Sequence, residues 1–212
     1  NRNSDTLIPR CDTKFQFHDL VFIITKREGV PVLMKHFGLS RINVDRVMIF
    51  GGGVIAEMLA KDLIHQVSDI KILEINKERC FELAEKLGNQ VQIVNGDGRN
   101  SDFLLDEDIK NYDAFVALTD SDETNILSCV AARKFGVERT IAEVENIEYI
   151  HIAEEMGVDN VINKKLITAG RIFKFTLSGK ARFVRYMTGT DAEVIEYTVA
   201  PGSQITTGPI TD

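Results

Sequence analysis

A glycine-rich loop follows a short apolar segment in VMIFGGGVIAEMLAKDL, residues 47–63. Read as G-x-G-x-x-A, the loop places Gly51, Gly53 and Ala56 at the spacing of a dinucleotide-binding motif. Gly51 would permit a tight turn, Gly53 would let a diphosphate approach the main chain, and Ala56 would allow close helix–strand packing. The phosphates would bind free amides at the positive end of a helix that begins at Val54. The alternative is a tight turn without a ligand.

An acidic residue at the end of the next apolar segment favours the dinucleotide interpretation. KILEIN places Glu74 23 positions after Gly51, where a carboxylate would accept hydrogen bonds from the adenosine ribose hydroxyls. It would also disfavour a 2′-phosphate, because like charges repel in a partly desolvated cleft. The alternative for Glu74 is a solvated acid at a strand end.

Polar residues also follow two later apolar segments, in NGDGRNSD and ALTDSDETN. Asp97 and Thr119 would point into the same cleft, near the adenine and ribose. Alternatively, Asp120, Ser121 and Asp122 only cap the helix that follows them. No loop spacing supports a metal site. The residues expected to bind the ligand are Gly51, Gly52, Gly53, Val54, Ile55, Glu74, Ile75, Asn76, Asp97, Gly98, Leu118, Thr119 and Asp120.

Alternating strands and helices would position these residues. Short apolar segments rich in β-branched residues predict strands at 47–50, 70–75, 91–94, 114–118, 140–144 and 158–162. Strands that are apolar on both faces and joined by crossover helices predict an α/β fold with a doubly wound, Rossmann-like parallel sheet. Its ligand cleft lies at the carboxyl ends of the strands. The apolar residues with helical spacing are Val54, Met58 and Leu59, then Phe81, Ala84 and Leu87, then Ile126, Leu127, Val130 and Ala131, and finally Ile150, Ala153 and Met156.

Composition narrows the possible partners. The chain has 212 residues, a net charge of −7 and a pI near 5.2, so it offers no field that attracts nucleic acid or anionic lipid. Cys11, Cys80 and Cys129 are widely separated and are expected to be reduced thiols. The longest apolar run, at 20–24, is far shorter than the roughly 20 residues of a membrane-spanning helix, and the start has no signal-peptide core. We expect a cytoplasmic chain that reaches a membrane only through a partner.

Residues for nicotinamide chemistry are not evident. A dehydrogenase needs a general acid or base beside the reactive carbon. None of the four tyrosines is followed four residues later by lysine, and the four histidines are expected in strands or helices away from the cleft rim. We therefore expect no enzyme. The alternatives are an NAD-dependent oxidoreductase of unknown substrate, and a nucleotide-binding assembly module without a transporter. The tyrosines and histidines are Tyr112, Tyr149, Tyr186 and Tyr197, and His18, His36, His65 and His151.

A family resemblance links these segments. The segments MIFGGGVIAEMLAKDL, KILEIN, QIVNGDGRNSDFL, YDAFVALTDSDETNILSCVAARKFGV, IAEVENIEY and GVDNVINKKLITAGRI occur in this order. Together they resemble the nucleotide-binding lobe of regulators of potassium conductance (RCK/KTN domains), and more narrowly that of TrkA-type potassium uptake regulatory subunits. The resemblance covers residue 44 to about residue 177. It implies a regulatory subunit that senses NAD(H) or ATP/ADP, gates a membrane potassium transporter subunit, forms a dimer or higher homo-oligomer, and lies on the inner face of the plasma membrane through that partner.

The flanks resemble parts of the same family. Residues 1–43 are similar to the end of a preceding α+β C-terminal regulatory lobe, 44–180 to the nucleotide-binding domain, and 181–212 to the start of the following lobe. In the family, the helix at 163–179 crosses to a neighbouring lobe and builds a dimer; the alternative here is packing on its own domain. Val54 and Glu143 stand where the family often has arginine. The missing cation and the added carboxylate disfavour a polyanionic nucleotide.

Overall fold

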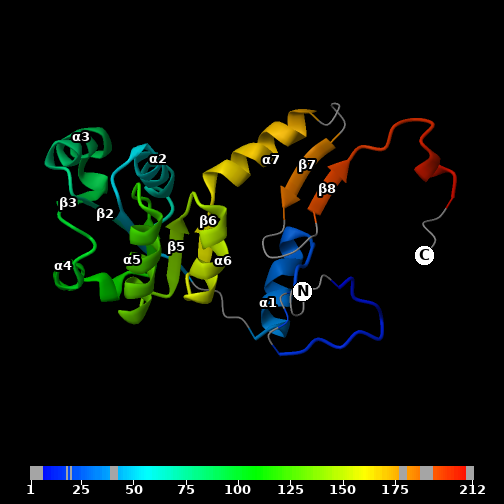
Figure 1. Cartoon of the computed structure of the whole chain (residues 1–212), viewed down its shortest axis with the longest axis horizontal. Coiled ribbons are helices and arrows are strands. Elements are labelled where there is room, and N and C mark those ends of the chain that lie inside the picture. The colour runs from blue at the N-terminus through cyan, green and yellow to red at the C-terminus, as the bar shows by residue number, and fades with distance from the viewer. Residues whose placement is uncertain are drawn as a thin grey trace. The chain divides into compact units, whose positions relative to one another are not determined.

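The computed structural model describes residues 7–17, 19, 21–38, 43–176, 181–186 and 193–208. His18, Leu20 and residues 177–180 lie outside these ranges. The expectations for His18, for the first residue of the apolar run and for the end of the helix expected at 163–179 therefore concern residues that are not described. The chain divides into two compact units (Figure 1). One unit is formed by residues 34–164, and the other combines residues 1–33 with residues 165–212. The boundaries at 43/44 and 180/181 stay a prediction.

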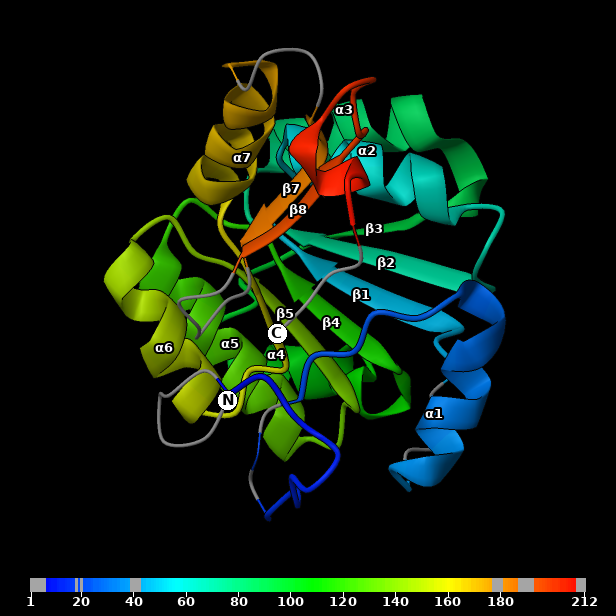
Figure 2. The ribbon, with the colours of Figure 1, turned by 90° about the vertical axis from the view of Figure 1, so that its right-hand side faces the viewer.

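A six-stranded parallel sheet forms the centre of the larger unit (Figure 2). The strand order is β3-β2-β1-β4-β5-β6. β2 and β3 therefore lie on one side of β1, and the strands from β4 to β6 lie on its other side. Phe50 pairs with Leu73 of one neighbour and with Ala117 of the other. This order confirms the doubly wound α/β fold. The strands are β1 Arg46–Phe50, β2 Asp69–Glu74, β3 Gln92–Asn95, β4 Ala114–Ala117, β5 Arg139–Glu143 and β6 Asn160–Ile162.

Helices cover both faces of this sheet, as Figure 2 shows. Helices α2 and α3 lie on one face, and α4, α5 and α6 lie on the other. Short apolar strands fit this arrangement because each strand must bury residues on both faces. The bounds are α2 Val54–Leu63, α3 Lys77–Leu87, α4 Ser101–Asp106, α5 Asp122–Lys134 and α6 Ile147–Glu155, with 3₁₀ turns at Gly88–Gln90 and Ile109–Asn111.

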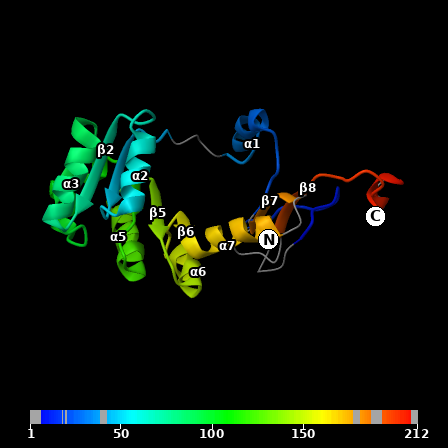
Figure 3. The same cartoon turned by 90° about the horizontal axis from the view of Figure 1, so that it is seen from above.

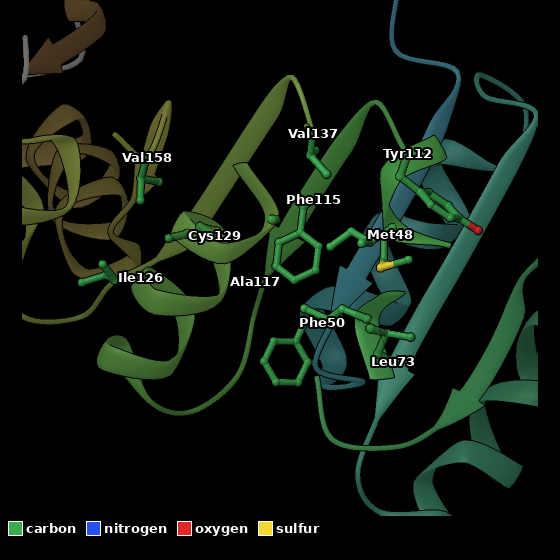
Figure 4. Close-up of a cluster of buried hydrophobic side chains, with 14 of the residues drawn as sticks. Met48, Phe50, Leu73, Tyr112, Phe115, Ala117, Ile126, Cys129, Val137 and Val158 are labelled. Atoms are coloured by element: carbon green, nitrogen blue, oxygen red, sulfur yellow. The ribbon is translucent and has the colours of Figure 1, made fainter. Parts of the chain in front are cut away.

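The core alternates between the two faces of β1. Val47 and Ile49 join the cluster beneath α2 and α3. Met48 and Phe50 join the cluster on the other face, where Figure 4 shows their side chains near Phe115. All are at most 5% exposed. Successive residues of β1 therefore lie on opposite faces of the sheet, so this one strand contributes to both halves of the core.

The helix faces differ in part from those indicated by apolar spacing. Met58, Phe81 and Leu127 are 62%, 67% and 58% exposed, so they do not face the sheet. On α2 the sheet-facing residues are instead Ala56 and Ala60, both fully buried. Small side chains let the helix axis approach the strands closely, and the larger apolar residues then lie on the outer face.

The smaller unit contains a two-stranded antiparallel sheet and most of helix α7, Lys164–Thr176 (Figure 3). The first residue of α7, Lys164, belongs to the larger unit. Strands β7 Ala181–Tyr186 and β8 Glu193–Tyr197 form this sheet. Helix α1 Val30–His36 spans the limit between the units, and 3₁₀ turns lie at Arg27–Gly29 and Gln204–Thr206. Within the described ranges, no helix combines the length and the apolar character needed to cross a bilayer.

Candidate functional site

A cleft of about 660 Å³ lies at the carboxyl ends of the central strands, where the strand order reverses. It therefore occupies the place where doubly wound sheets bind ligands. Three residues from the expected set, Val54, Ile55 and Gly98, are outside its lining. The lining residues are Phe50, Gly51, Gly52, Gly53, Leu73, Glu74, Ile75, Asn76, Arg79, Asp97, Arg99, Leu118, Thr119, Asp120, Ser121 and Thr124.

The three glycines of the loop differ in what they require. Gly51 has φ +98°, and a Cβ on it would lie 2.7 Å from the carbonyl oxygen of Leu118. A Cβ on Gly52 would lie 2.8 Å from a carboxylate oxygen of Glu74. A Cβ on Gly53 would meet no atom within 4 Å. The protein's own packing therefore requires glycine at the first two positions, whereas Gly53 leaves the main chain open to the cleft at the start of α2.

Glu74 connects two loops at the cleft. Its Oε2 accepts a hydrogen bond from the Gly52 amide at 2.6 Å, and its Oε1 accepts one from the Asn76 amide at 2.7 Å. Asn76 in turn caps α3, because its side-chain oxygen accepts hydrogen bonds from the amides of Glu78 and Arg79. A carboxylate has about four acceptor sites, so Glu74 retains capacity for ribose hydroxyls.

Arg79, which the motif reading did not include, fixes the other side of the glycine loop. Its Nε donates to the carbonyl oxygen of Gly52 at 2.7 Å, and its two Nη atoms donate to Glu57 at 2.9 Å and Glu82 at 2.7 Å. The Gly52 peptide is thus bound at its N–H by Glu74 and at its C=O by Arg79. The sequence offered one signal for Arg79, its position in the first turn of the helix that follows β2. The direction of its side chain could not be predicted, because it depends on how α3 is rotated about its axis.

A second arginine missing from the expected set lies in the loop after β3. Arg99 forms a two-pronged ion pair with Asp97: Nε lies 2.9 Å from Oδ1, and Nη2 lies 2.7 Å from Oδ2. Arg99 thereby lowers the pKa of the Asp97 carboxyl. Gly98, between them, is buried, and a Cβ there would lie only 2.6 Å from the ring of Phe50. This glycine lets the loop lie against the end of β1.

Asn125 fixes the loop after β4. Its side chain is 1% exposed and makes four hydrogen bonds. The amide oxygen accepts from the Thr119 amide at 2.9 Å and hydroxyl at 2.7 Å, and the amide nitrogen donates to the carbonyl oxygens of Thr119 and Glu143, both at 2.9 Å. The cleft residue Thr119 is therefore joined to the end of β5.

The neighbouring polar residues have different roles, and Asp122 has neither of the two considered for it. Ser121 caps α5 by accepting a hydrogen bond from the Thr124 amide at 3.2 Å. Asp122 accepts hydrogen bonds from the amides of Glu145 and Asn146, each at 2.8 Å, and so orders the loop after β5. Asp120 lines the cleft. Ser121 contributes both the cap and part of the lining.

Val54 and Glu143, which the resemblance compares with family arginines, lie outside the cleft lining. Val54 is 70% exposed in the first turn of α2, followed by Ile55 at 41%. The Glu143 side chain is 7% exposed and is paired with the Lys164 ammonium. Glu143 therefore lies outside the cleft lining with its charge balanced by Lys164, and the expectation that it disfavours a polyanionic nucleotide stays a prediction.

The described cleft lining contains polar, charged and apolar side chains but no histidine, cysteine or tyrosine. His36, His65 and His151 lie outside it. In the part of the chain that the structure describes, no group of three or more metal-ligating side chains comes together. The lining offers the main chain of Gly53 at the start of α2, the carboxylate of Glu74 and two arginines that are paired with carboxylates.

The chain is similar to potassium uptake proteins along nearly its whole length. It is 31% identical over 210 residues to the Trk system potassium uptake protein TrkA homolog 2 of Methanosarcina mazei, covering 99% of this chain and 47% of that protein. It is 35% identical over 189 residues to the TrkA homolog of Archaeoglobus fulgidus, covering 89% and 43%. The chain thus spans about half the length of the curated relatives that it matches.

Solved structures share the fold at lower identity. The TrkA-N domain of the inner membrane protein YbaL from Escherichia coli has a TM-score of 0.56 at 17% identity, covering 64% of this chain and 98% of that one. GsuK bound to ADP has a TM-score of 0.56 at 18% identity, with coverage of 71% and 41%. The GsuK channel bound to NAD has a TM-score of 0.53 at 17% identity, with coverage of 68% and 27%.

The family assignment rests on the sheet and on the segments that surround the cleft. Residues 47–164, from β1 to the start of α7, match the model of the TrkA-N domain. This region contains every lining residue of the cleft. The chain therefore belongs to the TrkA-N domain family.

Proposed function

We propose that this chain is the nucleotide-binding regulatory part of a Trk-type potassium uptake system, and that it binds NAD(H) or ATP/ADP in the cleft. The observation that carries the proposal is Gly53: it opens the main chain to the cleft at the start of α2, although no packing contact requires a glycine there. A helix N-terminus with accessible amides favours phosphate groups. Relatives of this fold named as bound to NAD and ADP support the ligand class.

The expected site residues have a consistent division of roles in this proposal. The diphosphate binds amides at Gly53 and the first turn of α2. The ribose donates hydrogen bonds to Glu74, whose orientation is fixed by Gly52 and Asn76. Thr119 and Asp120 border the site from the loop after β4. All four candidate nucleotides share the adenosine diphosphate moiety that these groups would contact.

Regulation would follow from differential binding. A nucleotide shifts a two-state equilibrium only by its difference in affinity for the two states, typically about 1–3 kcal/mol, or 5- to 150-fold. The partner in this proposal is a membrane potassium transporter subunit, which would bring the regulator to the inner face of the plasma membrane. A dimer or higher homo-oligomer would transmit the change.

Calorimetry with NAD, NADH, ADP and ATP tests the binding step. We expect wild type to bind at least one of them and Gly53→Val to abolish binding with the fold intact, because the added side chain projects into open space. Gly208→Val is a matched control, since a Cβ there also meets no atom within 4 Å and residue 208 lies outside the larger unit. Absence of binding at millimolar concentrations would overturn the ligand class.

Potassium flux tests the regulatory step. The full-length regulator would be reconstituted with its cognate membrane subunit, and flux measured across nucleotide concentrations with wild type and Glu74→Ala. We expect the variant to lose the nucleotide response while basal flux remains. Flux that ignores both nucleotide and mutation would contradict the proposal. Steady nicotinamide oxidation or reduction with a small metabolite would instead favour an oxidoreductase.

A further inference from the structure

The order of the strands locates the base of a bound adenine nucleotide. The glycine loop follows β1, Glu74 ends β2, and Arg99 lies in the loop after β3, the edge strand next to β2. Adjacent strands are about 4.8 Å apart. With phosphates at Gly53 and ribose at Glu74, as proposed above, the base extends toward the loop that contains Asp97 and Arg99. The inference below rests on that proposed function.

Arg99 is bound to Asp97 along one edge of its guanidinium group, and these hydrogen bonds do not use the two flat faces of that group. Two of its nitrogens contact the two carboxylate oxygens of Asp97, at 2.9 and 2.7 Å. Asp97 also accepts a hydrogen bond from the Arg99 amide at 3.0 Å. One edge of the guanidinium is thus occupied, while 62% of the side chain is exposed and the residue lines the cleft. A planar guanidinium stacks well on aromatic ring systems.

Ile75 adds apolar surface to the same part of the cleft. It follows β2, lines the cleft and is 62% exposed, although most large apolar residues of the sheet are buried. Asn95, at the end of β3, donates hydrogen bonds to the carbonyl oxygens of Glu74 and Ile75, each at 2.9 Å. The loops after β2 and β3 are therefore joined beside the place expected for the base.

We propose that Arg99, oriented by Asp97, is the platform on which the adenine ring stacks, with Ile75 as an apolar neighbour. Asp97 is then a positioning residue, because both of its carboxylate oxygens contact Arg99. Its negative charge also offsets that of Arg99, which suits a neutral purine better than a phosphate. This role differs from that of an arginine that binds phosphate. If Arg99 stacks on the base, a lysine at this position should not replace it, whereas a lysine should replace an arginine that binds phosphate.

Binding of AMP and of ribose 5-phosphate, followed by NMR titration into the millimolar range, separates base from phosphate recognition. We expect Arg99→Ala to weaken AMP binding by about 5- to 30-fold and to leave ribose 5-phosphate binding unchanged. Arg99→Lys behaves like alanine, since lysine keeps the charge but has no plane. In wild type, the Arg99 Nε–H proton moves upfield with AMP only, because it lies over the purine ring.

Two further variants define the role of Asp97 and the specificity of the effect. Asp97→Asn weakens AMP binding less than Arg99→Ala, and the double variant is no weaker than Arg99→Ala alone. Arg133→Ala is the matched control: it also removes an arginine paired with an aspartate, Asp159 at 2.6 Å, but outside the cleft lining. Its AMP affinity stays at the wild-type value.

The proposal is overturned if Arg99→Ala binds AMP as wild type does, if both ligands lose affinity equally, or if lysine restores AMP binding. The last two results assign Arg99 to the phosphate. If wild type binds an adenine nucleotide and substitutions of Arg99 do not change that affinity, this inference fails but the proposed function stands. Wild type that binds no adenine nucleotide overturns both.

Discussion

The carboxylate of Glu143, at the end of β5, forms an ion pair with the ammonium of Lys164, the first residue of α7. The carboxylate is almost buried, whereas the lysine is 44% exposed. Lys164 also lies 3.5 Å from Glu145, and its pKa is raised chiefly by its hydrogen bond to Glu143. The Asn163 side chain donates to the carbonyl oxygens of Val144 and Glu145 at 2.9 and 3.0 Å. The start of α7 is thus bound to the carboxyl end of the sheet.

Removing the lysine should destabilise the larger unit. We expect Lys164→Met to lower the free energy of unfolding by about 2 kcal/mol, because a buried carboxylate loses its partner. Adding Glu143→Gln should recover part of this loss, since the charge that lacked a partner is removed. Urea unfolding at pH 7 measures both, with the exposed Lys110→Met as control. Equal stability of Lys164→Met and wild type would contradict the structural role of the pair.

Alanine at two neighbouring glycines should have different effects. Gly51→Ala should cost about 1–3 kcal/mol for the left-handed backbone alone, and more from the contact with Leu118. Gly53→Ala should change stability by less than about 1 kcal/mol, because Gly53 has an extended backbone and open space at its Cβ. Thermal and urea unfolding compare the two variants. A similar loss in both would show that the loop conformation differs from the one described.

Asn125→Ala should be among the most destabilising polar substitutions in the sheet unit. It removes four hydrogen bonds, three to partly buried groups of Thr119 and one to the buried carbonyl oxygen of Glu143, which should cost about 3 kcal/mol. Asn111→Ala is the control, because that side chain donates to the Asp108 carboxylate at an exposed site. Its cost should stay within about 1 kcal/mol. Similar losses for both asparagines would remove the special role of Asn125.

Acid should selectively weaken the contacts of Glu57. Hydrogen bonds from Lys61, Arg79 and Lys86, at 2.8, 2.9 and 3.1 Å, lower its pKa from 4.5 to about 2. Because the folded-state pKa lies below the unfolded one, this stabilisation is complete above about pH 4.5 and is lost as the pH falls toward 2. The stability advantage of wild type over Glu57→Gln should therefore shrink across that window in urea titrations.

A control for the acid experiment is Glu82→Gln, which removes another partner of Arg79 but leaves the three cations around Glu57. The acid-dependent difference should persist in that background. A constant difference between wild type and Glu57→Gln from pH 6 to pH 2.5 would show that the Glu57 carboxylate is not stabilised as described.

The sheet could be predicted from sequence because its strands are short, apolar on both faces and separated by polar loops. The helix faces were harder, since a rule that favours large apolar residues selected Met58 and Phe81. Ala56, which the glycine motif placed for close helix–strand packing, and Ala60 face the sheet, because small side chains let the helix approach the strands. Alanine is only weakly hydrophobic, so a search for regularly spaced apolar residues does not identify a helix face made of alanines.

The cleft could be placed from the glycine loop and Glu74, whose positions along the chain follow from the motif. Arg79 and Arg99 could not be, because no motif spacing includes them. Arg79 reaches the loop only through the rotation of α3, and Arg99 enters the cleft because Gly98 lets its loop lie on Phe50. The pairing of Glu143 with Lys164 joins residues 21 positions apart and depends on the end of β5 meeting the start of α7.

The Gly52 peptide, bound by Glu74 on one side and Arg79 on the other, has a kinetic consequence. A loop that already has its binding conformation does not need to rearrange when a ligand binds, and it loses little conformational entropy. In stopped-flow experiments we expect the observed rate of nucleotide binding to rise linearly with nucleotide concentration, whereas a loop that must first rearrange gives a rate that saturates. The duration of any regulatory signal would then be set by the residence time of the nucleotide, and not by the speed of its capture.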